Sequence, residues 1–321
     1  MIPVTAKHAP MRFFLALIAC LAFAEPARAE RTTINVAFVP VADAVPLRYA
    51  LQQGWFEKAG LDVKLTTVGS GSLATIAVVG GAADIGTANM LSIVVARQKG
   101  IPLMVVVPQA QYDASNPTTQ LLVSTDSPIR SAKDLEDRTV AVGGLHDLLA
   151  LGVKAWMSQN GADPAKVHFV EAVQSTMLGA LDAKRVDAFV VSEPVLAAAE
   201  ASGRTRMLAG AYGSIAKRFV VDGWFAMAPW LAAHRDAALR FADVMHRATL
   251  YTNAHYDEIL PLIGSYTSIA PDVLRKMRQI KDAQVLGADQ IQPVIDAAAK
   301  YGEIPAAFPA SEMVFTARTR F

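Results

Sequence analysis

Two glycine-rich turns, each lying between a β-rich run and a helical run, have the composition of a site for an acidic group. They are residues 69–72 (GSGS) and residues 143–146 (GGLH). Glycine leaves the backbone N–H groups accessible at the positive end of the following helix, which suits a carboxylate, sulfonate or phosphate-like group. The hydroxyls of Ser70 and Ser72 could add donors. Simple capping of the helix by Ser72 explains the same residues without a ligand.

Other candidate residues follow strands, where ligands bind in open α/β sheets. Glu193 comes after an apolar run, and it could accept hydrogen bonds from an amine-bearing ligand or bond across the molecule. Trp224 could stack on a ligand or belong to the core. The candidate ligand-binding residues are Val41, Asp43, Ser70, Gly71, Ser72, Asn89, Gly144, His146, Glu193 and Trp224.

No set of residues in the sequence matches a known catalytic or metal-binding pattern. The motifs H-E-x-x-H, G-x-S-x-G and G-x-x-x-x-G-K are absent, and a single Cys excludes a thiolate zinc site. Residues 69–74 formally fit a dinucleotide fingerprint, but the nearest downstream acid, Asp84, opens the next strand instead of ending it. We therefore expect no catalytic residue, no metal and no cofactor.

The elements that must position these residues alternate between strand-like and helical patterns. Strands are predicted at 33–39, 61–68, 84–87, 103–107, 120–124, 139–142, 167–170 and 188–191. Helices are predicted at 46–53, 72–79, 90–99, 145–160, 176–184 and 195–201, and the chain after Trp224 is nearly all helical in pattern, including 232–252 and 289–300. Such alternation predicts an α/β fold with mostly parallel sheets flanked by helices.

An internal echo predicts two similar halves. Trp55 precedes Asp84 by 29 residues and Trp156 precedes Asp187 by 31, and each interval holds a strand, a Ser/Thr-capped helix and a tight turn. Two segments with Pro, Gly or Asn, 108–119 and 208–222, are predicted to cross between the halves, which would let them hinge. We expect lobe I to comprise 30–110 and 215–321, and lobe II to comprise 111–214.

The composition is that of an ordinary globular protein. The 321 residues are 53% hydrophobic, which is too apolar for a disordered chain. They include 30 Lys and Arg against 29 Asp and Glu, so the chain carries no electrostatic footprint for nucleic acid.

The N-terminus, residues 1–29, has the pattern of an export signal. Basic residues precede an apolar run at 13–24, and residues 27–29 (ARA) form a small-x-small cleavage site before Glu30. The run is shorter than the roughly 20 residues that span a bilayer. Residues 17–20 (LIAC) resemble a lipoprotein cleavage box. A mature chain that starts at Cys20 is less favoured, since it would open on the apolar residues 21–24. Met11 is an alternative start.

Several stretches together resemble a known family. They are PLRYALQQGWFEKAGLDVKL (46–65), GSGS (69–72), GGAADIGTAN (80–89), KDLEDRTVAVGG (133–144) and VDAFVVSEP (186–194). In order and spacing they resemble the type 2 periplasmic solute-binding proteins of ABC importers, and most closely the nitrate/sulfonate/taurine and thiamine-pyrimidine-precursor binding group. The C-terminal third matches only in its helical character.

The resemblance implies two lobes, a deep cleft between them and no catalysis. It places ligand contacts at the 40–46 loop, the 69–72 turn, Asn89, the 143–146 turn and Glu193. It implies a periplasmic monomer that captures a small anion (sulfonate, nitrate, carboxylate or pyrimidine-like) for an ABC permease and its ATPase. It does not identify the ligand, and no Arg falls clearly inside the candidate loops.

Two other classes of protein remain open on this reading. One is an enzyme on the same fold, similar to the pyrimidine-precursor synthase of thiamine biosynthesis. The export signal and the single Cys argue against it, because such enzymes are cytosolic and carry a Cys-rich motif. The other is a sensor that presents its ligand to a membrane receptor kinase.

Overall fold

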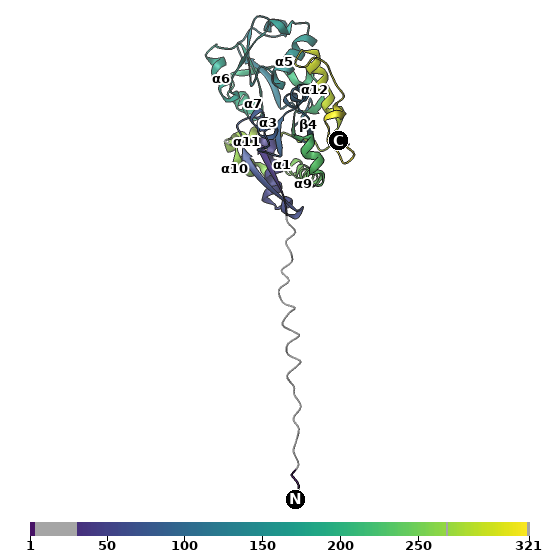
Figure 1. Cartoon of the computed structure of the whole chain (residues 1–321). Coiled ribbons are helices and arrows are strands. Elements are labelled where there is room, and N and C mark those ends of the chain that lie inside the picture. The colour runs from purple at the N-terminus through teal and green to yellow at the C-terminus, as the bar shows by residue number, and fades with distance from the viewer. Residues whose placement is uncertain (4–30, 268, 320–321) are drawn as a thin grey trace.

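A computed structural model describes residues 1–3, 31–267 and 269–319. The predicted export signal, apart from residues 1–3, and the alternative at Cys20 lie outside the described residues. Over the described chain, two five-stranded sheets flanked by helices are joined by a two-stranded ribbon (Figure 1). None of the described helices combines the length and the apolar character that crossing a membrane requires.

The first sheet has the strand order β2-β1-β3-β12-β4. Its strands are β1 (Thr32–Phe38), β2 (Leu61–Thr67), β3 (Ile85–Asn89), β4 (Leu103–Pro108) and β12 (Asp222–Met227). β1 runs parallel to β2 and β3, and β12 lies antiparallel between β3 and β4. Every residue of β4 is buried, as expected of a strand with both faces covered.

The second sheet repeats this arrangement, in the order β10-β6-β9-β7-β8. Its strands are β6 (Thr119–Ser124), β7 (Thr139–Val142), β8 (His168–Glu171), β9 (Ala188–Ser192) and β10 (Thr205–Ala209). β7 runs parallel to β8 and β9, and β6 lies antiparallel between β9 and β10. The two sheets therefore share one topology, and the echo in the sequence reflects it.

The two chain crossings pair with each other. β5 (Gln111–Asp113) and β11 (Arg218–Val220) form an antiparallel ribbon within the predicted crossing segments, with Tyr112 opposite Phe219. The ring of Tyr212 lies 5.6 Å from that of Tyr112 and 5.5 Å from that of Phe219. An aromatic cluster thus packs beside the strands that join the two sheets.

Helices cover the faces of both sheets. Around the first sheet lie α1 (Val45–Gln52), α2 (Trp55–Lys58), α3 (Gly71–Val79), α4 (Met90–Gln98), α8 (Ala228–Ala233) and α9 (Arg235–Ala254). Around the second lie α5 (Leu148–Gln159), α6 (Gln174–Asp182) and α7 (Val195–Ala201). The C-terminal part adds α10 (Tyr256–Tyr266), α11 (Pro271–Lys276) and α12 (Ala288–Lys300).

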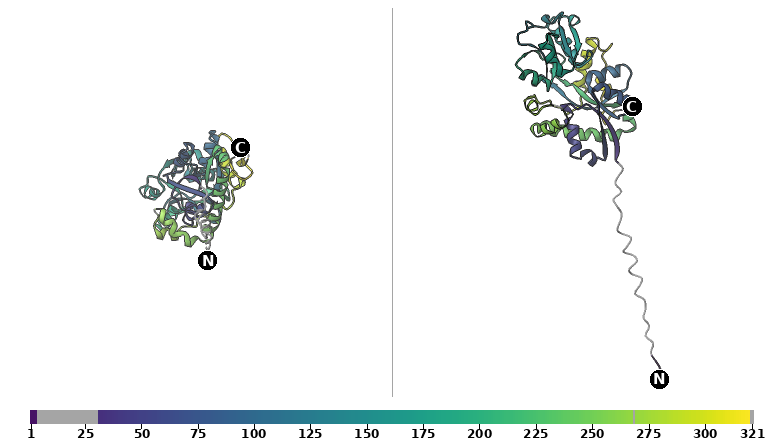
Figure 2. Two further views of the ribbon diagram at one scale, coloured as in Figure 1. Left: turned by 60° about the horizontal axis from the view of Figure 1, so that its bottom comes forward. Right: turned by 90° about the vertical axis from the view of Figure 1, so that its left-hand side faces the viewer.

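The C-terminal helices contact both halves (Figure 2). α12 packs against α4 beside the first sheet and against α5 beside the second, and α11 packs against α7. Ion pairs reinforce both contacts. Glu303, after α12, binds Lys154 of α5 at 2.6 Å, and Arg278, after α11, binds Glu200 of α7 at 2.9 Å. The predicted helical character of the chain after Trp224 is confirmed, but the strand β12, which ends at Met227, was not predicted.

Candidate functional site

A cavity of about 990 Å³ lies between the two sheets, at the ends of their parallel strands. Segments 39–43, 70–72, 87–89 and 221–222 line it from the first sheet, and segments 143–149 and 192–195 line it from the second. Most of these segments follow β1, β2, β3, β7 and β9, the place where open α/β sheets bind ligands. The volume is in the range of small-molecule sites.

The structure brings nine of the ten candidate residues to this cavity. They are Val41, Asp43, Ser70, Gly71, Ser72, Asn89, Gly144, His146 and Glu193. Trp224 is not among the lining residues. Its side chain is 1% exposed and packs in the core of the first sheet and α9, so the geometry assigns it to the core and not to the site.

The 69–72 turn begins α3 one residue earlier than expected. Ser70 is the N-cap, and its Oγ accepts a hydrogen bond from the backbone N–H of Leu73 at 3.3 Å. The assignment of the cap to Ser72 is therefore wrong. A β-carbon on Gly71 would stand 3.0 Å from the Cα and Cβ of Ala88, so the packing of α3 on β3 leaves little room for a side chain at this position.

Asn89 and Asp147 cap two further helices that begin at the cavity, α4 and α5. The Oδ1 of Asn89 accepts a hydrogen bond from the N–H of Ser92, and the Oδ1 of Asp147 accepts one from the N–H of Ala150, both at 2.9 Å. Burial raises the pKa of Asp147 to about 6. Asp147 is absent from the sequence-based candidates, although Asp directly before an apolar helical run is a recognisable N-cap signal.

Glu193 bonds across the molecule. Its Oε2 accepts from the N–H of Ala197 at 3.0 Å, and its Oε1 accepts from the backbone N–H of Arg278 at 3.1 Å and from Nη1 of Arg278 at 3.2 Å. Burial raises the pKa of Glu193, while these hydrogen bonds act in the opposite direction. Glu193 could accept from a ligand or bond across the molecule, and the structure shows partners for the bond across the molecule.

His146 stands at the rim of the cavity and is also tied to the C-terminal part. Its Nδ1 lies 2.9 Å from Oε2 of Glu303, whose other oxygen binds Lys154. The His146 side chain is 82% exposed, whereas that of Glu303 is 4% exposed. The contact therefore places an exposed imidazole over a buried carboxylate at the mouth of the cavity.

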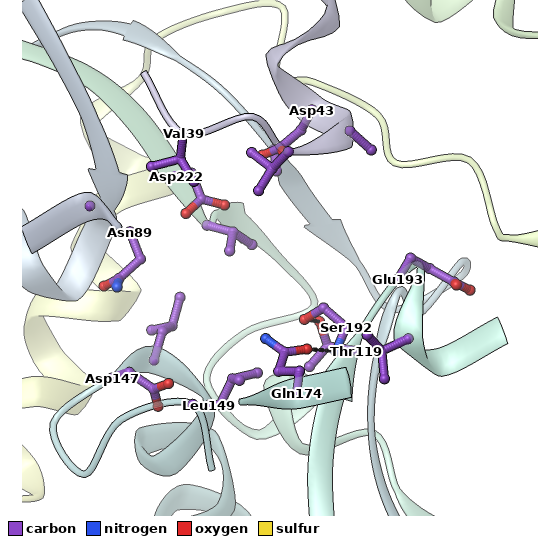
Figure 3. Close-up of a pocket in the computed structure, with 18 of the residues that line it drawn as sticks. Val39, Asp43, Asn89, Thr119, Asp147, Leu149, Gln174, Ser192, Glu193 and Asp222 are labelled. Carbon is purple, nitrogen blue, oxygen red and sulfur yellow. Dashed lines mark hydrogen bonds between the residues drawn. The ribbon is translucent and has the colours of Figure 1, made fainter. Parts of the chain in front are cut away.

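Asp43 and Asp222 both approach the cavity from the first sheet. Asp43 lies in a short 3₁₀ turn after β1, and Asp222 opens β12. Figure 3 shows both side chains directed into the same region of the cavity. Burial raises the pKa of Asp43 to about 6, and burial together with the charge of Asp43 raises the pKa of Asp222 well above its ordinary value. Asp222 is a second residue that the sequence analysis missed.

Uncharged polar groups from the second sheet face this pair across the cavity (Figure 3). The hydroxyls of Thr119 and Ser192 lie 2.8 Å apart, and the backbone N–H of Ser192 donates to Oε1 of Gln174 at 3.2 Å. The Gln174 amide nitrogen has no partner within the described residues, so it is available as a donor.

The charged groups that line the cavity are of one sign. The described lining residues include the acids Asp43, Asp147, Glu171, Glu193 and Asp222 and the single His146, but no Lys or Arg. In the same described region, no group of three or more His, Cys, Asp or Glu side chains is placed to hold a metal ion. The expectation of an anionic ligand thus has no basic side chain in the lining to support it.

Comparisons with known proteins agree with this architecture. A family model described as NMT1/THI5 like matches residues 42–259. A protein of Brachyspira hyodysenteriae, provisionally named an ABC transporter periplasmic binding protein, is 26% identical over 210 residues. The match spans 59% of this chain and 59% of that protein, so the chain matches well under two thirds of its relative's length.

Solved structures show the same fold at low sequence identity. The periplasmic aliphatic sulphonate binding protein of Escherichia coli superposes with a TM-score of 0.73 at 15% identity, covering 88% of this chain and 92% of that one. The MOPS-bound alkanesulfonate-binding protein of Xanthomonas axonopodis gives 0.73 at 16% identity, covering 89% and 99%. The periplasmic nitrate-binding protein of Synechocystis gives 0.68 at 15% identity, covering 88% and 84%. The predicted two-lobed α/β fold is confirmed.

Proposed function

Since the chain belongs to the NMT1/THI5-like family, we propose that it is the solute-binding component of an ABC importer. It captures a small solute outside the cytoplasm and delivers it to a membrane permease that an ATPase drives. The names of its relatives support this assignment, because they describe ABC and periplasmic binding proteins. We propose further that it acts in the periplasm as a monomer and without catalysis.

One observation carries the proposal: a cavity of about 990 Å³ lies between two sheets that a ribbon, β5 with β11, joins. Lobe I, residues 30–110 with 215–321, then moves relative to lobe II, residues 111–214. Because both lobes line the cavity, a solute that contacts both favours the closed arrangement over the open one. A permease can recognise that closed form.

The nature of the ligand follows from the lining instead of from the relatives. A small anion held by helix ends and hydroxyls is the expectation from the sequence, and the relatives' names mention sulfonates and nitrate. The lining holds five carboxyl side chains and, among its described residues, no Lys or Arg. We therefore do not propose an anionic ligand.

Thermal denaturation with a library of small solutes of every charge class tests the assignment. A ligand at 100 times its dissociation constant stabilises the folded state by about 2.7 kcal/mol, which raises the melting temperature measurably. Small-angle scattering should then show a smaller radius of gyration with that ligand. Cells that carry the chain and its permease should take up the ligand faster than cells that carry the permease alone. Chemical turnover of the ligand, without stimulated uptake, would contradict the assignment and favour an enzyme.

A further inference from the structure

We propose that the solute is an organic cation, an amine, amidine or guanidine, whose charged group binds between Asp43 and Asp222. The inference rests on the proposed solute-binding function and specifies its ligand class. It follows from a comparison of the acidic side chains that line the cavity: some have hydrogen-bond or ion-pair partners in the protein, and others have none.

Three of the five lining carboxyl groups are already engaged by the protein. Asp147 accepts the N–H of Ala150, and Glu171 accepts the N–H of Leu145 at 2.9 Å. Glu193 is held by the backbone and guanidinium of Arg278. These three therefore already have roles in helix starts and in contacts between segments.

Asp43 and Asp222 differ from those three residues. Within the described chain, neither carboxylate forms an ion pair, and no other residue donates a hydrogen bond to either one. The Asp43 carboxylate accepts only from its own backbone N–H. Asp43 is only 8% exposed, yet its side chain is directed into the cavity (Figure 3). A carboxylate that is more than nine-tenths buried and has no cationic partner is costly, because desolvation penalises its charge.

A third buried acid lies beside this pair. Asp282 is 4% exposed, and its Oδ1 has no hydrogen-bond partner within the described residues. Burial raises the pKa of Asp282 well above its ordinary value, and the charges of Asp43 and Asp222 raise it further, so the three carboxyl groups are close enough to repel one another when ionised. A bound cation would offset this repulsion, whereas a bound anion would increase it.

The opposite wall of the cavity indicates the character of the rest of the ligand. Gln174, Ser192 and Thr119 offer uncharged donors and acceptors, and Leu149 adds apolar surface (Figure 3). The ligand expected here has a cationic head toward Asp43 and Asp222. Its uncharged remainder lies toward the second sheet.

A screen by charge class tests the inference on the full-length processed protein at pH 7.5. The cations are phenethylamine, agmatine, putrescine and benzamidine, together with the amines and guanidines of a metabolite library. The matched controls are the corresponding alcohols and amides, which are uncharged, and the corresponding carboxylates and sulfonates with nitrate. Melting temperature identifies ligands, and isothermal titration calorimetry measures their affinity.

We expect only cations to stabilise the protein. A stabilising anion or neutral solute, with no stabilising cation, would overturn the ligand class and leave the solute-binding function standing. If no compound of any class stabilises the protein, the proposed function fails and the inference fails with it.

Substitutions then locate the cationic group. D43N and D222N should each weaken binding of the best cation about tenfold or more, the scale of a lost hydrogen bond to a charged group. The control is E57Q, which removes one negative charge from an exposed residue of α2 that pairs with Arg31 outside the cavity and should leave affinity unchanged. Because D43N also removes a buried charge, it should raise the melting temperature of the ligand-free protein, so weaker binding cannot be attributed to unfolding. Unchanged affinity in both cavity variants would overturn the placement.

Discussion

Asp187 and Thr139 are joined by two hydrogen bonds. The carboxylate of Asp187 accepts from the backbone N–H of Thr139, and the N–H of Asp187 donates to the carbonyl of Thr139, each at 2.9 Å. Asp84 and Asn35 make the same pair of bonds in the other half, at 2.7 Å each. Asp84 thus ties β3 to β1 in the first sheet, and Asp187 ties β9 to β7 in the second.

Removal of the Asp187 carboxylate should destabilise the protein. Asp187→Ala leaves the partly buried N–H of Thr139 without its acceptor, which costs about 1–3 kcal/mol. Urea denaturation measures the loss, and Asp187→Asn is the matched control, because its amide oxygen can still accept. Equal losses in both variants would show that the hydrogen bond to Thr139 contributes little.

Much of the fold is predictable because most of its elements carry local patterns. The eight predicted strands are present and alternate with helices, and the equivalent positions of Asp84 and Asp187 reveal the repeat. β12 was not predicted because residues 222–227 begin with Asp-Gly and follow a glycine-containing crossing. What makes it a strand is its pairing with β3 and β4, more than 100 residues earlier in the chain, and local periodicity cannot show such a pairing.

The site was predictable to the extent that it lies in strand-to-helix turns. Asp222 was missed for the same reason as β12, since only the sheet brings it opposite Asn89. The partners of Glu193 and His146 lie in the C-terminal segment, on residues Arg278 and Glu303, whose sequence gives no sign of where they pack.

The two serines of the 69–72 turn should have separable effects. Ser70→Ala removes the N-cap of α3 and should lower the free energy of unfolding by about 1 kcal/mol. Ser72→Ala lies inside the helix, where the structure gives its side chain no capping bond, and should change stability by much less. Denaturant titration of both variants without ligand distinguishes them, and a larger loss for Ser72→Ala would contradict the cap assignment.

Gly71 should behave as a packing residue. Gly71→Ala places a β-carbon 3.0 Å from Ala88, so α3 must shift away from β3, and overpacking of this kind typically costs about 1–3 kcal/mol. Gly71→Val should cost more. Melting temperatures of the two variants check this order, with Gly179→Ala as the control, because a β-carbon there meets no atom within 4 Å.

The stability of the ligand-free protein should have its maximum on the acidic side of neutrality. Several buried carboxyl groups have raised pKa values in the folded state, including Asp43 and Asp147, each at about 6. A raised folded-state pKa contributes stability that is complete below the unfolded value near 4 and is lost as the pH rises through the folded value. Groups with lowered pKa values, such as Asp113 at about 2, lose their contribution only as the pH falls below 4.

Asp43 allows this pH dependence to be assigned to one residue. Its pKa of about 6, against an ordinary value of 3.8, corresponds to about 3 kcal/mol at most between pH 4 and pH 7. Three neighbouring groups have pKa values that burial raises and that the charge of Asp43 raises further. They are Asp222 of β12, Asp282 after α11 and Tyr266 of α10. Urea denaturation from pH 4 to pH 8 should show the wild-type free energy of unfolding falling as the pH rises. In Asp43→Asn the decline should be shallower, because the neutral amide has no proton to lose and no longer repels the neighbouring carboxylates. A parallel decline in both proteins would show that Asp43 does not titrate as a buried group.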